Sequence, residues 1–91
     1  MKKLNKNLAV TCLEQTGAEL MVELNDGRVL RLNESADGRA VLAWLFASGS
    51  DYRAGDVAQV EQAHVFERNG RSAAYFLGLA LWNLQYDGRI A

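Results

Sequence analysis

The chain has no proline, one cysteine and one histidine in 91 residues. Without proline there is no X-Pro bond to isomerise and no rigid proline-rich linker. A single cysteine excludes an intramolecular disulfide and a cysteine-clustered zinc site. The scarcity of these residues also argues against an enzyme, because catalysis by a nucleophile and a base needs several reactive groups to converge.

We therefore expect no catalytic residue, no metal site and no cofactor. Cys12 shares a predicted strand face with Leu8 and Val10, so a buried, inert thiol is the simpler interpretation. His64 follows Val60 at helical spacing, which favours a packed or half-buried histidine over a metal ligand.

An excess of charge and a long apolar segment are also missing. Ten Lys and Arg against eleven Asp and Glu give a net charge of -1, which provides no general attraction for nucleic acid or an anionic membrane. The longest nearly uncharged run, residues 72–86, is too short to span a bilayer. Residues 1–7 are basic, but no apolar region follows them, so they do not form a signal peptide. These absences predict a soluble, cytoplasmic protein.

What the chain does contain is typical of one globular domain spanning residues 1–91. Hydrophobic residues make up 49% and charged residues 23% of the chain, which suits a folded protein rather than a disordered one. Alternating apolar residues predict strands at residues 7–12 (NLAVTC), 18–24 (AELMVEL) and 28–33 (RVLRLN).

The second and third predicted strands form a hairpin around Asn25, Asp26 and Gly27. A three-residue loop with Gly27 in the left-handed region pairs Leu24 with Arg28. We prefer this register because both sheet faces then become chemically consistent. It places Leu30 beside Val22, Leu32 beside Leu20, and Arg31 beside Met21.

The rest of the chain predicts three helices. The first begins after a cap at Asn33 or Ser35, runs through an apolar stretch to Phe46 and ends at the SGS of residues 48–50. The second covers about residues 56–66. The third begins at a Ser72 cap, extends to about residue 86 and ends at Gly88.

The third predicted helix has apolar residues on two sides, which is unusual for a surface helix. One side carries Ala73, Leu77, Leu81 and Leu84, and the other carries Tyr75, Leu79, Trp82 and Tyr86. Two explanations remain open. The helix lies centrally, between the sheet and the other helices, or its aromatic side lines a groove or a dimer contact.

This layout resembles the PqqD-like proteins, the winged-helix RiPP recognition elements of peptide-modification pathways. The resemblance rests on LRLN (residues 30–33) running directly into ESADGRAVLAWL, and on LWNLQYDGRI at residues 81–90. It covers residues 7–90. It implies an α+β, winged-helix-like domain in which a three-stranded antiparallel sheet is followed by three helices.

The resemblance further implies a non-catalytic protein of natural-product biosynthesis, a peptide chaperone that captures an extended leader peptide by strand addition and presents it to a modifying enzyme. Members of the family bind the peptide along the third strand, over a groove shared with the last helix. The implied peptide-binding residues are Arg28, Val29, Leu30, Arg31, Tyr75, Leu79, Trp82 and Tyr86. The implied partners are a precursor peptide and its modifying enzyme, with a homodimer also possible.

Two other functions fit the sequence. One is a small regulatory or phage-type interaction protein, or a dimeric adaptor, that uses the aromatic side of the last helix on a protein partner. The other is a winged-helix DNA-binding domain, which is less favoured because the last helix offers only Asn83 and Gln85, and no positive charge, for contacts with bases and phosphates.

Overall fold

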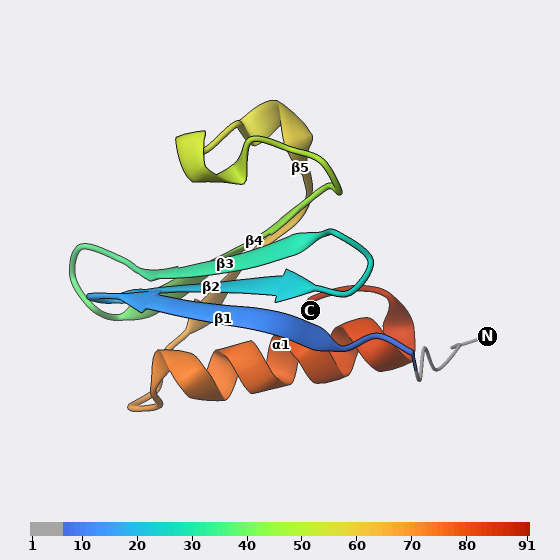
Figure 1. The fold of residues 1–91 in the computed structure, drawn as a ribbon. Coiled ribbons are helices and arrows are strands. Elements are labelled where there is room, and N and C mark those ends of the chain that lie inside the picture. Colours follow the sequence, from blue (N-terminus) through green and yellow to red (C-terminus); the bar gives the residue numbers. More distant parts are fainter. Residues whose placement is uncertain (1–6) are drawn as a thin grey trace.

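The computed structural model describes residues 7–91 and shows a five-stranded antiparallel sheet with one long helix packed against it (Figure 1). The strands lie side by side in chain order. They are β1 (Val10–Thr16), β2 (Glu19–Leu24), β3 (Val29–Glu34), β4 (Ala40–Phe46) and β5 (Val60–Glu67). Two short 3-10 helices, η1 (Tyr52–Ala54) and η2 (Val57–Gln59), connect β4 to β5, and α1 (Ala73–Asp87) follows β5.

The predicted hairpin between the second and third strands is confirmed, including its register. Leu20 pairs with Leu32, Met21 with Arg31, and Val22 with Leu30. The Leu24 N–H donates to the Arg28 carbonyl at 2.9 Å, which closes the loop. Gly27 has φ 89°, in the region that the bulged loop requires of a glycine.

The predicted fold class is wrong, because two of the three predicted helices are strands. The apolar stretch before Phe46 forms β4, which pairs with β3, and most of the segment predicted as the second helix forms β5, which pairs with β4. The protein is therefore an α+β meander of five strands followed by one helix, not a winged-helix-like arrangement of three strands and three helices.

The physical reason lies in the two faces of β4. Val41, Ala43 and Leu45 point to the face under α1, yet Leu42 and Trp44 on the opposite face are also partly shielded. A strand that is apolar on both faces shows no period of two, so its sequence cannot be told from that of a buried helix.

The first strand also differs from its prediction. It lies at Val10–Thr16 instead of residues 7–12, and its pairing with β2 shifts between Val10 and Cys12. Cys12 is exposed on this edge strand, so the expected buried thiol is wrong. His64 is likewise exposed on β5, although its ring lies edge-on to Phe66 at 4.6 Å between centroids.

The third predicted helix is confirmed as α1. The Ser72 side chain caps its first turn by accepting the N–H of Tyr75, and Gly88 ends it at φ 72°. Within the part of the chain that the structure describes, no helix is long and apolar enough to cross a membrane. Residues 1–6, which hold most of the segment judged not to be a signal peptide, lie outside the described residues.

The core lies between α1 and one face of the sheet, which we call the covered face (Figure 1). Phe76, Ala80 and Leu84 of α1 are buried against it. The Phe76 ring stacks on Phe66 of β5 at 5.2 Å between centroids. The buried residues contributed by the sheet and the chain ends are Leu8, Leu20, Val22, Leu24, Leu30, Leu32, Val41, Ala43, Leu45, Phe66 and Ile90.

The opposite, distal face of the sheet is covered only in part. Residues 47–59, with η1 and η2, lie over it (Figure 1). The Tyr52 hydroxyl donates to the Glu23 carboxylate at 2.8 Å, and Arg31 donates to the Tyr52 carbonyl at 3.0 Å. Val29 and Phe46, which point to this face, are buried.

Replacing Gly27 with alanine tests the loop geometry. The new Cβ would clash with the Ser48 Oγ, and φ is 89°. We expect Gly27→Ala to lower the free energy of unfolding by about 1 kcal/mol or more, measured by chemical denaturation. Gly17→Ala is the matched control, because Gly17 has positive φ but open space around it. Equal losses for the two variants would contradict the close approach of the loop to Ser48.

Candidate functional site

The predicted peptide groove beside the third strand is not formed. β3 is the central strand and is hydrogen-bonded to β2 on one side and β4 on the other. Its backbone therefore has no free edge for an added strand. Val29 and Leu30 are buried, so their side chains offer no surface to a ligand.

The two arginines of that predicted groove form ion pairs within the protein. Arg28 lies 2.7 Å from Asp26 and 3.6 Å from Glu61. Arg31 lies 2.8 Å from Glu19, its diagonal neighbour on β2, and it also donates a hydrogen bond to the Tyr52 carbonyl. Both side chains link the sheet to its loops. Their charges are therefore neutralised within the protein and do not indicate a ligand.

The aromatic side of α1 faces away from the sheet. Tyr75, Trp82 and Tyr86 are 43%, 55% and 39% exposed, and Leu79 is partly buried against the core. Trp82 and Tyr86 contact each other at 4.3 Å between ring centroids. The explanation that α1 lies centrally between a sheet and other helices is therefore wrong, and its second apolar side is an outer surface.

A free strand edge exists instead on β5. The Arg68 N–H donates to the Arg39 carbonyl at 2.8 Å, so the backbone groups of every second residue from Arg68 backwards point to β4. Those of Ala63, Val65 and Glu67 consequently point outward. Among the described residues no strand lies on this outer edge.

The sequence of β5 does little to protect that edge. Natural edge strands are commonly blunted by lysine, proline or charges in the middle of the strand. β5, with the sequence VEQAHVFE, contains neither lysine nor proline, and its charges are confined to Glu61 and Glu67 near the two ends. Its centre is therefore chemically suited to pair with another extended chain.

Beside this edge lies an apolar surface on the distal face, which we call the distal patch. It consists of Leu42, Trp44, Val57, Val60, Ala63 and Val65. Leu42 pairs across the strands with Val65, which is 60% exposed, and Trp44 pairs with Ala63. Trp44 lines two open depressions, of about 490 Å³ and about 340 Å³, so both are available to side chains of a ligand.

The other half of the distal face is polar, and its charged groups pair with one another. The guanidinium of Arg53 lies 2.8 Å from the Glu14 carboxylate and holds the pKa of Glu14 below its usual value. The hydrogen bond that Tyr52 donates to Glu23 raises the pKa of the Tyr52 hydroxyl. Because these groups already have partners, the unsatisfied part of the distal face is the apolar half over β4 and β5.

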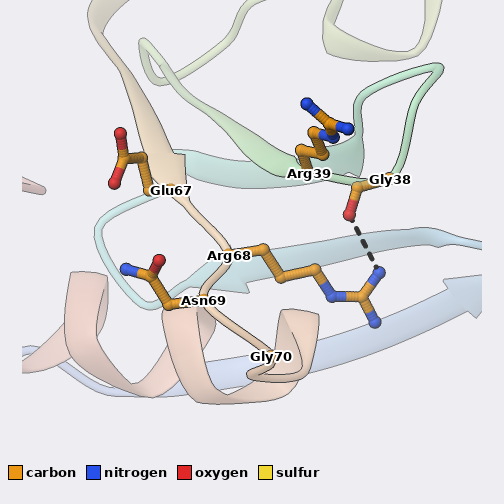
Figure 2. A pocket seen from close by; sticks show the side chains of 6 residues that line it. All are labelled: Gly38, Arg39, Glu67, Arg68, Asn69 and Gly70. Atoms are coloured by element: carbon orange, nitrogen blue, oxygen red, sulfur yellow. Dashed lines mark hydrogen bonds between the residues drawn. The ribbon is translucent and has the colours of Figure 1, made fainter.

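A depression of about 580 Å³ lies between the β3–β4 turn and the end of β5, lined by Gly38, Arg39, Glu67, Arg68, Asn69 and Gly70. Figure 2 shows Arg68 extending toward Gly38, whereas the Arg39 side chain points away. Arg68 donates to the carbonyls of Arg71 and Gly38 and pairs with Glu34 at 3.1 Å. Its positive charge thus joins the end of β3, the β3–β4 turn and the β5–α1 loop rather than holding an anion.

Within residues 7–91 no three His, Cys, Asp or Glu side chains gather closely enough to hold a metal ion. Comparison of the chain with models of protein families, with curated proteins and with solved structures finds no match. The site must therefore be judged from its own geometry, in which a free strand edge lies next to an exposed apolar patch.

The sequence did not reveal this site, because its residues were assigned to helices. One signal was available. Asp37 and Gly38 form the dipeptide that most often marks a tight hairpin turn, and here they connect β3 to β4, with Gly38 at φ 70°. If Asp37 and Gly38 are interpreted as a hairpin turn, the apolar stretch after them is a fourth strand. The sheet then extends beyond β3, and its free edge lies further along the chain.

Amide hydrogen exchange tests the assignment of the free edge. We expect the amides of Ala63 and Val65 to exchange rapidly and those of His64 and Phe66 slowly, because only the second pair donates to β4. NMR-detected exchange at each residue measures this directly. Protection of all four amides, as in a helix, or of none, would contradict the orientation of β5.

Proposed function

We propose that this protein is a non-catalytic module that binds an extended peptide as an additional strand on the outer edge of β5. The observation that carries the proposal is the free edge formed by the backbone of Ala63, Val65 and Glu67, lying directly beside the distal patch. Strand addition obtains its affinity from backbone hydrogen bonds, and its specificity from pockets that receive alternate side chains. Both elements are present at this edge.

The surroundings of β5 suggest the chemistry of the ligand. Every second side chain of an added strand would lie on the distal face, next to Val65 and Ala63, and would extend the distal patch. Apolar residues at those positions suit it. Glu67 is exposed at the C-terminal end of β5, so a basic residue of the peptide near that end would be favoured, whereas Glu61 at the other end already pairs with Arg28.

This proposal keeps the capture of an extended peptide and moves it from β3 to β5. A leader segment of a precursor peptide, presented to a modifying enzyme, belongs to the class of ligand that such an edge would take. So does an unfolded or terminal segment of another protein partner. The chemistry that both share is an extended backbone with alternating apolar side chains.

A synthetic probe tests the proposal. A capped peptide with valine and threonine alternating between terminal lysines is titrated into ¹⁵N-labelled protein. Binding should shift the amide signals of Ala63, Val65 and Glu67 and slow their hydrogen exchange, because these N–H groups acquire acceptors. Val65→Pro removes one outward N–H without breaking the ladder to β4, and proline is tolerated on edge strands in that orientation. We expect it to weaken binding by roughly tenfold or more.

His64→Pro is the matched control for the backbone. It removes a hydrogen bond to β4, so it should lower the stability of the sheet, which Val65→Pro should largely preserve. Titration shifts confined to α1, or equal binding by the wild type and Val65→Pro, would show that β5 is not the binding edge.

A further inference from the structure

The outer surface of α1 is unusual for a helix that faces water. Six of its positions are exposed, namely Ala74, Tyr75, Gly78, Trp82, Tyr86 and Asp87, and Asp87 alone among them is charged. Surface helices normally place charged and polar residues on this side. We call the exposed side made by Tyr75, Leu79, Trp82 and Tyr86 the aromatic stripe. It is about 16 Å long, given the rise of an α-helix.

Gly78 adds a second observation to the aromatic stripe. Glycine is the least favourable helix residue after proline. Nothing within 4 Å of Gly78 would contact an added Cβ, so the subunit itself gives no packing reason for a glycine there. A helix position without a side chain allows another element to approach closely from outside. Ala74, one turn earlier and also exposed, extends this small-residue area beside the aromatic stripe.

The large and small residues are arranged so that the surface is complementary to itself. Trp82 and Tyr86 occupy the C-terminal half of α1, and Ala74 and Gly78 the N-terminal half. If two copies of α1 cross antiparallel at the level of Ala80, Trp82 of each copy lies opposite Gly78 of the other. Tyr86 then lies opposite Ala74. Each of the two large side chains thus lies opposite a small residue of the other copy, as an isologous contact requires.

The uncharged body of α1 is compatible with this orientation. No charged residue lies between Ala73 and Tyr86, so two copies bring no like charges together along the aromatic stripe. In the same register Arg71, whose guanidinium lies 4.2 Å from the Tyr75 ring centroid, comes level with Arg89 of the other copy. Both arginines lie outside the aromatic stripe, and Arg89 is exposed, so water and salt screen their repulsion.

From this complementarity we infer that the aromatic stripe binds a second copy of this chain, and that the protein forms a two-fold symmetric dimer through antiparallel α1 helices. The inference is independent of the peptide-binding proposal, because α1 lies on the covered face and the distal patch on the other. Both β5 edges remain free in such a dimer.

The available area sets the strength of the dimer. A fully covered Tyr or Trp buries about 150–250 Å², so the three half-exposed rings of the aromatic stripe have roughly 300 Å² left to bury. A stable interface of standard size buries about 800 Å² on each partner. The dimer is therefore weak and depends on concentration.

Sedimentation velocity over a concentration series spanning the micromolar range tests the dimer. The wild type should change from monomer to dimer within the series. Trp82→Ala should raise the dissociation constant by about 30-fold or more, as the loss of a central aromatic residue does. Gly78→Gln should also weaken the dimer by about tenfold or more while leaving the melting temperature of the monomer unchanged or raised, since glutamine favours helix over glycine.

Leu13→Gln is the control, because Leu13 is an exposed apolar residue on β1 and lies outside the aromatic stripe. It should leave the dissociation constant unchanged. A wild type that stays monomeric throughout the series overturns the inference, and so does association that neither α1 variant weakens. A dimer that Leu13→Gln disrupts as strongly as Trp82→Ala would place the contact elsewhere and would overturn it as well. Each of these outcomes leaves peptide binding at β5 to its own test.

Discussion

The packing of α1 against one face of the sheet is the interaction on which the rest of the structure depends. Five strands in a meander present two faces, and the chain supplies one long helix to cover them within residues 7–91. Phe76, Ala80 and Leu84 bury the covered face, with the stack of Phe66 on Phe76 joining β5 to the helix. Because burial of apolar area is the main stabilising term, this contact decides which side of every strand is core.

The helix leaves part of the sheet and its own outer side uncovered. The distal face is closed over its polar half by residues 47–59, through Tyr52 and Arg31, and is left apolar and open over β4 and β5. Among the described residues no strand pairs with the outer edge of β5, and the aromatic stripe of α1 carries no charge. A small domain has too little chain to cover every apolar surface, so the uncovered ones are where partners are expected.

Sequence reasoning succeeded where local chemistry determines local structure. The β2–β3 register followed from alternation and from Gly27, and α1 followed from its Ser72 cap, its uncharged body and Gly88. It failed for β4, because apolar residues on both faces remove the period of two and only tertiary structure decides between helix and strand. It failed for β5 because Val57, Val60 and His64 recur at helical spacing, although Val57 belongs to η2 and the other two to an exposed edge strand. The candidate site was missed for the same reason, because its residues lie mainly on β4 and β5. The two apolar sides of α1 were recognised, but the sequence left open whether the aromatic side is exposed. Its expected neighbour β3 is enclosed by β4, which the sequence predicted as a helix.

The pairing of β4 with β5 is the central claim, because the free edge, the distal patch and the position of α1 all depend on it. Nuclear Overhauser effects between backbone Hα protons measure it directly. Leu42 with Val65 and Trp44 with Ala63 are paired without mutual hydrogen bonds, which brings their Cα atoms to about 4.5 Å. The account predicts a strong Hα–Hα signal for both pairs. Their absence, together with the medium-range signals of a helix across residues 40–46 and 60–67, would contradict it.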